Sequence, residues 1–204
     1  MMQRTELRIS LAALVVAFST GLSSVWTPSA IALPGQSTDE VATWLRSTPS
    51  LKPGPGEKLT VRRSNTASQR MIFEASMFAP GKLTRKSASG GVVRSESLQL
   101  FDMLYGVTKA RLEEALRSIY GLEITQDYEQ AEVVYSYPTA QEERNALRQN
   151  KPIAAALQGE LRRGRRFAYW IEVARNPTGL NYAGKIVVFL NEDLAKVESD
   201  IQSR

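Results

Sequence analysis

Residues 152–190 read PIAAALQGELRRGRRFAYWIEVARNPTGLNYAGKIVVFL. Two apolar segments, 152–161 and 167–174, flank the turn RRGRR, and a third apolar run, 185–190, follows the loop NPTGLNYAG. Short apolar runs separated by turns rich in Gly and Pro are typical of antiparallel strands. The run 185–190 is apolar on both faces, which indicates a central strand. This third of the chain therefore predicts an antiparallel sheet.

The register of the first two of these strands follows from requiring that each face of the hairpin be uniform. Pairing Leu161 with Phe167 makes one face apolar throughout, whereas a shift by one residue mixes polar and apolar side chains. In this register Tyr169 lies opposite Gly159 and covers its bare backbone. The other, more polar face carries Gln158, Glu160, Trp170 and Glu172. We therefore predict a hydrated sheet face, with Trp170 and Glu172 as a candidate site on it.

Upstream of this hairpin, further strands are predicted from β-type alternation that ends at Gly or Pro. They cover residues 59–63, 70–79 and 131–137. The segment 82–91, KLTRKSASGG, is expected to be a polar run followed by a flexible loop. Residues 98–105 fit either a strand or a helix, and the apolar residues that leave this open are Leu98, Phe101, Leu104 and Tyr105.

Helices are predicted where a capping residue precedes apolar residues at helical spacing. They begin near Thr38, Thr108, Thr139 and Asn191. The first and third open with capping boxes, which pair Ser37 with Glu40 and Thr139 with Glu142. Gly121 stands where the second helix should end. The predicted fold class is α+β: a mainly antiparallel β-sheet with three to four helices packed on it, in a single mature domain.

Residues 1–32 have the pattern of a cleaved secretory signal peptide. A short basic start precedes an apolar run, and Ala30-Ile31-Ala32 forms a cleavage site before Leu33. We therefore expect an exported, soluble protein in the periplasm or the extracellular space, and a thylakoid lumen also fits. The alternative is a membrane-tethered structural module that keeps residues 9–26 as an uncleaved anchor.

The rest of the chain divides into three parts by composition. Residues 33–47 form an N-terminal helical arm, and residues 48–57, TPSLKPGPGE, are expected to form an extended Pro/Gly linker and not a packed element. Residues 58–204 form the α+β domain.

The composition excludes several classes of enzyme. The 204 residues contain neither His nor Cys, which rules out a Ser-His-Asp triad, a thiolate nucleophile, a disulfide and a zinc site with nitrogen or sulfur ligands. No cofactor and no metal are expected. Loss of residues 1–32 removes Arg4, Glu6 and Arg8 and lowers the formal net charge from +5 to +4. This balance favours recognition of an acidic partner over catalysis.

Four guanidinium groups lie in the predicted hairpin turn: Arg162, Arg163, Arg165 and Arg166. Like charges at this density repel one another until an anion approaches. We therefore expect the turn to bind an anion on a partner. The leading hypothesis is an exported, non-enzymatic binding or assembly factor that docks an acidic protein or a membrane surface through this turn.

Nucleotide and nucleic-acid binding are not expected. Residues 179–185 match the pattern G-x-x-x-x-G-K, but Ile186 stands where a phosphate loop needs Ser or Thr, and the lysine opens a strand instead of a helix. These residues are interpreted as a hairpin loop. No nucleic-acid-binding module is present, and export removes the chain from most nucleic acid.

The alternative enzyme class is a carboxylate-dependent hydrolase acting on cell-wall or polysaccharide substrates, which would need two converging acids. Glu172 is the acid that best suits this role, because it interrupts an apolar strand near Trp170. Several aromatic residues lie at strand spacing: Tyr135, Tyr137, Phe167, Tyr169 and Trp170. We interpret them as core or half-exposed sheet residues, and the alternative is a platform on which a ligand stacks.

Overall fold

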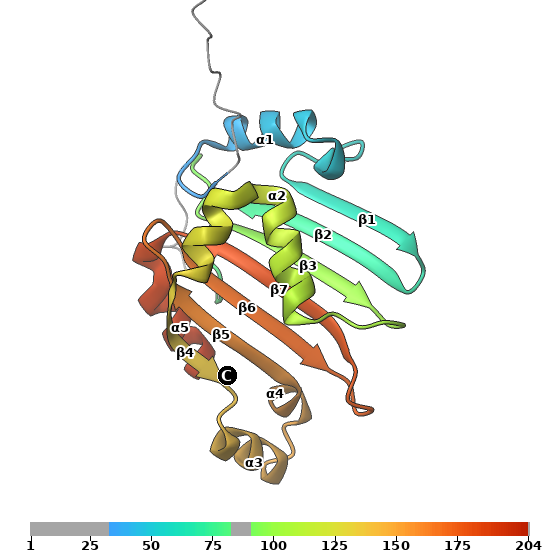
Figure 1. The fold of residues 1–204 in the computed structure, drawn as a ribbon, viewed down its shortest axis with the longest axis vertical. Coiled ribbons are helices and arrows are strands. Elements are labelled where there is room, and N and C mark those ends of the chain that lie inside the picture. The colour runs from blue at the N-terminus through green and yellow to red at the C-terminus, as the bar shows by residue number, and fades with distance from the viewer. Residues whose placement is uncertain (1–32, 83–90, 204) are drawn as a thin grey trace, which may run out of the picture.

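The structure is a computed structural model that describes residues 33–82 and 91–203 (Figure 1). The predicted signal peptide and most of the segment 82–91 lie outside these residues. In the described part of the chain, no helix is long and apolar enough to cross a membrane.

The predicted α+β fold is confirmed: one open antiparallel sheet has seven strands in the order β1-β2-β3-β7-β6-β5-β4. The strands are β1 (Thr60–Thr66), β2 (Gln69–Ser76), β3 (Ser95–Asp102), β4 (Glu132–Tyr137), β5 (Leu157–Arg163), β6 (Ala168–Arg175) and β7 (Asn181–Phe189). The apolar run predicted to be central is β7, which lies in the middle of the sheet. In the segment 98–105, which fitted either a strand or a helix, residues 98–102 belong to strand β3 and residues 103–105 form a turn.

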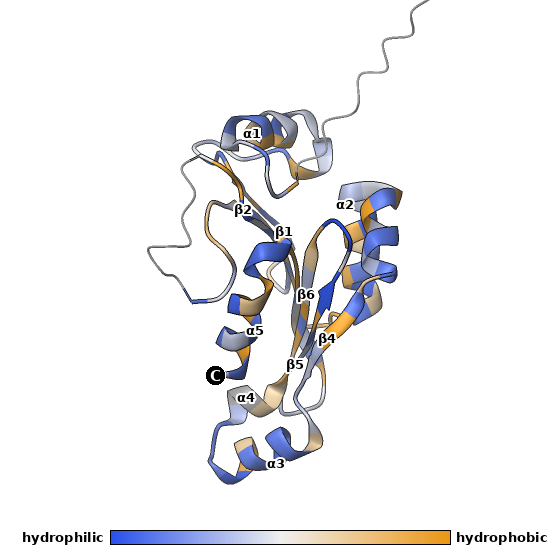
Figure 2. Ribbon diagram, turned by 90° about the vertical axis from the view of Figure 1, so that its left-hand side faces the viewer, coloured by the Kyte–Doolittle hydropathy of each residue, from blue (hydrophilic) through white to orange (hydrophobic). Residues whose placement is uncertain are grey.

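The α-helices are α1 (Thr38–Ser47), α2 (Lys109–Glu129), α3 (Ala140–Arg148), α4 (Pro152–Ala156) and α5 (Leu194–Gln202). Both predicted capping boxes are present, at the starts of α1 and α3. Helices α2 and α5 lie on opposite sides of the sheet (Figure 2). Side chains of α1 and α2 share one hydrophobic core with the sheet, and α5 forms a second core on the other face.

The N-terminal helix is part of the main core. Val41 and Leu45 of α1 are fully buried against the sheet. Within the predicted linker 48–57, the 3-10 turn Pro49–Leu51 buries Leu51 in the same core. This part of the linker is therefore packed, which corrects the expectation of an extended segment.

Helix α2 continues beyond the predicted end at Gly121. This glycine has a φ of 73°, a conformation that side chains with a Cβ disfavour, and it kinks the helix. The helix resumes because Ile124 and Tyr128 on the following turns are buried against the sheet. Its second half, absent from the prediction, carries Asp127 toward the arginine turn.

The predicted register of the β5–β6 hairpin is wrong. Leu161 pairs with Trp170, and Gly159 pairs with Glu172. The strand is also shorter than predicted, because its first residues form helix α4. The turn takes up residues 164–167 instead of closing around Gly164 alone. The shift reverses the parity of the pairing, so Leu161 shares the α5 face with Trp170 instead of the α2 face with Tyr169.

Gly159 is covered by a different tyrosine from the one predicted. A Cβ at this position would lie 2.5 Å from Oη of Tyr137 on β4 and 2.6 Å from the carbonyl oxygen of Ile171. Trp170 and Glu172 are 3% and 7% exposed, so the sheet face predicted to be hydrated is buried at these residues. Gln158 and Glu160 lie on the opposite face, which carries α2.

Candidate functional site

The arginine turn is organised around a carboxylate from the same chain. Asp127 of α2 accepts hydrogen bonds from the backbone N–H groups of Arg165 at 3.0 Å, Arg166 at 3.1 Å and Phe167 at 3.3 Å. It also accepts a hydrogen bond from the Tyr169 hydroxyl at 2.7 Å. The turn backbone therefore already binds an anion in the folded chain.

Two of the four guanidinium groups are paired within the protein. Arg162 lies 2.6 Å from Glu160 and above the ring of Tyr128, and Arg166 lies 3.0 Å from Glu123. These pairs offset the repulsion expected within the turn. The side chains of Arg163 and Arg165 are exposed, and no acidic partner contacts them among the residues described. Arg163 and Arg165 are therefore the two guanidinium groups of the turn most available to an outside anion.

The two sheet-face residues predicted as a site, Trp170 and Glu172, are joined by two residues that the sequence did not indicate. Trp170 Nε1 donates to the Tyr137 hydroxyl at 2.7 Å, and that hydroxyl donates to Glu172 Oε2 at 2.5 Å. Lys185 Nζ lies 2.9 Å from Glu172 Oε1 and 3.6 Å from the centroid of the Trp170 ring. Both oxygen atoms of Glu172 are engaged, so this cluster fixes the orientation of its members.

Two acids of the hairpin border one groove of about 360 Å³, but their side chains lie on opposite faces of the sheet. They are Glu160 and Glu172, and each contacts a cation. Burial raises the pKa of Glu160, but hydrogen bonds from Lys109 and Arg162 outweigh this effect and hold the pKa below its ordinary value. Glu160 is therefore ionised at neutral pH, so it carries no proton that it could donate as a general acid.

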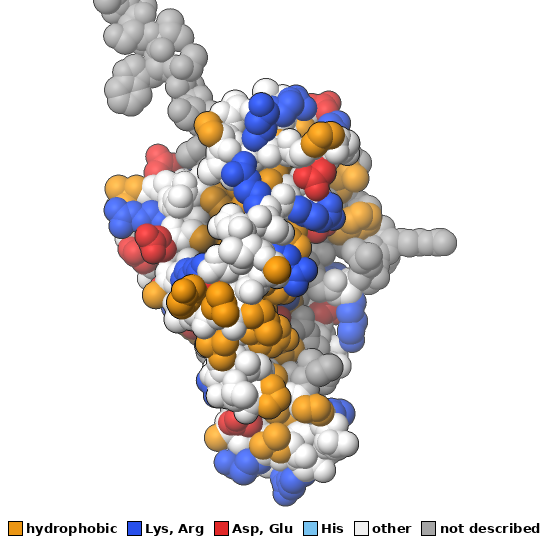
Figure 3. Space-filling view, turned by 90° about the vertical axis from the view of Figure 1, so that its right-hand side faces the viewer, with side chains coloured by type: hydrophobic (Ala, Val, Ile, Leu, Met, Phe, Trp, Pro, Cys, Tyr) orange, Lys and Arg blue, Asp and Glu red, His pale blue; other side chains and the backbone are white. Residues whose placement is uncertain are grey.

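An apolar surface that the sequence did not reveal lies at the end of β3. Three consecutive side chains project from the loop there: Met103 is 54% exposed, Leu104 is 62% exposed and Tyr105 is 78% exposed. In Figure 1 this loop lies at the right-hand end of the sheet. Figure 3 shows that side of the molecule, with hydrophobic side chains gathered at its middle and Lys and Arg side chains around them.

A groove of about 750 Å³ extends this surface between the α3–α4 segment and the β6–β7 loop. Its apolar lining includes Met103, Leu147, Pro152, Pro177 and Tyr182. We call the loop and the groove together the apolar end surface, defined by Met103, Leu104, Tyr105, Leu147, Pro177 and Tyr182. It lies at the opposite end of β6 from the arginine turn.

The exposed loop is held in place by a buried acid. Asp102 is 1% exposed and accepts hydrogen bonds from the backbone N–H groups of Leu104 at 3.1 Å and Tyr105 at 2.9 Å. Arg111 of α2 donates to Asp102 at 2.7 Å and to the carbonyl oxygen of Gly106 at 2.8 Å. These contacts lower the pKa of Asp102 to about 2, and the backbone hydrogen bond from Tyr105 contributes most to the lowering.

A local sequence signal for this loop was present. An aspartate that bonds to backbone groups two and three residues later is a common turn former, and Gly106 has the positive φ of 77° that closes the loop. Between Asp102 and Gly106, the apolar residues Met103, Leu104 and Tyr105 fall in a turn and not on a helix.

Comparisons with known proteins add no identification. Neither the protein-family models, nor the curated proteins, nor the solved structures contain a match to this chain. Within residues 33–82 and 91–203, no group of three or more acidic side chains is arranged to hold a metal ion.

Proposed function

We propose that this protein is an exported, non-enzymatic binding or assembly factor that docks an acidic protein partner through the apolar end surface. The observation that carries the proposal is the exposure of Met103, Leu104 and Tyr105 on a loop fixed by Asp102. Clustered exposed apolar side chains commonly mark interaction sites. A loop that is already ordered loses little conformational entropy when a partner binds.

The charge around this surface favours an acidic partner. Arg111 contacts the loop directly, Arg175 lines the groove together with one acid, Glu143, and Arg70 lies over the ring of Phe101 at the end of β3. Apolar cores with a charged rim are the usual arrangement of protein interfaces. The groove beside the loop favours a protein partner over a flat membrane surface, because a protein side chain can fill it.

The arginine turn has a secondary place in this proposal. Asp127 and the partners of Arg162 and Arg166 already satisfy most of its charge, which leaves Arg163 and Arg165 to contribute long-range attraction. The pairing of Glu160 and Glu172 with cations favours binding over hydrolysis. Export rests on the pattern of residues 1–32, and an intact mass that begins at Leu33 would test it.

The docking proposal is tested by recovery of native partners after crosslinking. The variant Met103→Ser/Leu104→Ser/Tyr105→Ser should lose its crosslinked partner, while Leu122→Ser should keep it. Leu122 is a matched control, because it is 58% exposed on α2 and lies outside the apolar end surface. Equal partner recovery by the two variants, both shown to be folded by circular dichroism, would contradict docking through this surface.

A further inference from the structure

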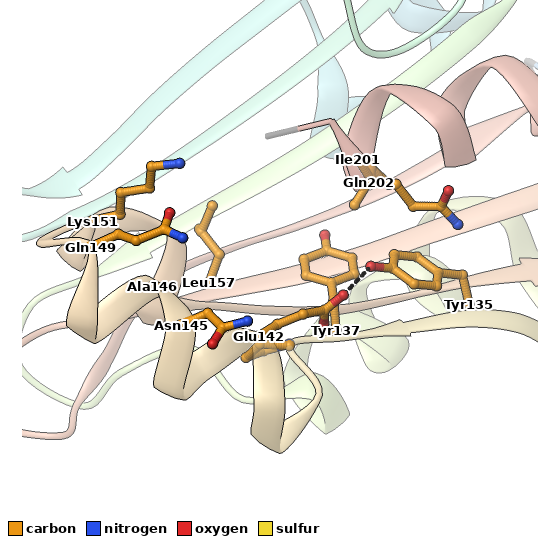
Figure 4. Close-up of a pocket in the computed structure, with 11 residues that line it drawn as sticks. Tyr135, Tyr137, Glu142, Asn145, Ala146, Gln149, Lys151, Leu157, Ile201 and Gln202 are labelled. Atoms are coloured by element: carbon orange, nitrogen blue, oxygen red, sulfur yellow. Dashed lines mark hydrogen bonds between the residues drawn. The ribbon is translucent and has the colours of Figure 1, made fainter.

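A pocket of about 190 Å³ lies between β4, α3 and the C-terminal end of α5 (Figure 4). Tyr135 and Tyr137 form one wall, with their rings stacked at 5.7 Å between centroids and 23° between planes. Both tyrosines are half-buried on the sheet and line the pocket. The wall therefore offers aromatic surface to a ligand.

Amide groups on α3, and one at the end of α5 beside Tyr135, have unused hydrogen-bonding capacity (Figure 4). Asn145 Oδ1 accepts from Gln141 and Arg148, which leaves the Asn145 amino group for a ligand. Gln202 donates to Glu198 and keeps its carbonyl oxygen. Gln149 has no side-chain hydrogen bond to any residue that the structure describes. Together these groups present both donors and acceptors.

The charge in the pocket is nearly balanced. Glu142 accepts hydrogen bonds from the Thr139 backbone N–H at 2.7 Å and the Tyr135 hydroxyl at 3.2 Å. The backbone bond is the main reason that the pKa of Glu142 lies below its ordinary value, so the side chain is ionised. Lys151 lines the pocket with the opposite charge. A ligand with a strong net charge of either sign would meet one like charge.

We infer that this pocket binds one neutral sugar ring of a saccharide. Hydroxyl groups both donate and accept, as the amides of Asn145, Gln149 and Gln202 require, and the C–H face of a sugar ring can lie on the tyrosine wall. An apolar ligand that covered the half-buried Asn145 would leave its amino group without a partner, which is costly. The volume is below the ~300–1,000 Å³ of a typical ligand site, so it suits one ring.

This inference does not depend on the apolar end surface. It is tested by NMR titration of the full chain. The probes are maltose, cellobiose and chitobiose, with inorganic phosphate as the charged comparison. At least one disaccharide should shift amide signals of β4 and α3. Asn145→Ala and Gln149→Ala should each weaken binding about tenfold. Arg144→Ala, on the same helix but outside the pocket, should leave binding unchanged.

Three results would overturn the inference. The first is that no amide signal shifts with up to about 10 mM disaccharide, since a dissociation constant above this concentration is too weak for a specific site. The second is that phosphate binds in preference to the sugars. The third is that neither alanine substitution changes the affinity for the sugar. If an alanine variant does not fold, the position of the shifts on the wild-type chain decides. Shifts confined to residues other than Tyr135, Tyr137, Asn145 and Gln149 would be a fourth contrary result, because they would place the sugar elsewhere.

Discussion

The carboxylate of Asp102 accepts a hydrogen bond from the backbone N–H of Tyr105 at 2.9 Å. This contact joins a buried acid to the most exposed large apolar side chain of the described residues, which is 78% exposed. The apolar loop is therefore a defined structure in the free protein. Such preorganisation is what separates a docking surface from an exposed segment of low order.

The first prediction concerns the acid that holds this loop. Because the folded-state pKa of Asp102 is lowered to about 2, its contribution to stability is present at neutral pH and is lost as pH falls from about 4 toward 2. Asp102→Asn should therefore reduce the dependence of the urea midpoint on pH in this range. At pH 7, hydrogen exchange at Leu104 and Tyr105 should be faster in Asp102→Ala than in the wild type. Unchanged exchange would show that the carboxylate does not order the loop.

The second prediction concerns Glu96, which is fully buried beneath α2. Its Oε2 accepts a hydrogen bond from Tyr120 at 2.7 Å, while Oε1 has no partner within the described residues. Burial raises the pKa of Glu96 to about 7, and the hydrogen bond from Tyr120 offsets only part of this rise. The folded state therefore holds a proton that the unfolded state has released, and stability should fall as pH rises from about 4.5 to 7.

Glu96→Gln should remove this slope and stabilise the protein at pH 8 by an amount on the order of 3 kcal/mol. The measurement is urea unfolding at pH 5 and pH 8, with Glu114→Gln as the control because Glu114 is an exposed acid on α2. A wild-type stability that does not change between these pH values would contradict the prediction.

The third prediction concerns the arginine turn. Asp127 is 8% exposed and accepts hydrogen bonds from the buried Phe167 N–H and Tyr169 hydroxyl, so Asp127→Ala should leave these donors unpaired and destabilise the protein by about 2–4 kcal/mol. Glu123→Ala removes only the exposed partner of Arg166 and should cost less than about 1 kcal/mol. Chemical denaturation of both variants measures the difference. Similar costs would mean that Asp127 does not organise the turn.

The sequence predicted those elements whose signals are local. The capping boxes at Ser37 and Thr139 predicted the starts of α1 and α3, and the apolar run 185–190 predicted the central strand. These signals involve residues within one turn or one strand, so they do not depend on the rest of the fold.

The hairpin register could not be predicted because it depends on a distant residue. Asp127 lies 38 to 40 positions before the backbone groups that it binds, and it fixes a four-residue turn. The same limit applies to the candidate site. Tyr137 and Lys185 join Trp170 and Glu172 only because β4 and β7 lie on either side of the hairpin.

The docking claim is tested most directly by a photocrosslinking side chain placed at Leu104 in the native host, with the same group at Leu122 for comparison. Both positions are strongly exposed, so both probes meet solvent equally well. The proposed function predicts a specific crosslink to an acidic protein from Leu104 and none from Leu122. Crosslinks of equal yield from both positions, or a crosslink from Leu122 alone, would contradict docking through the apolar end surface.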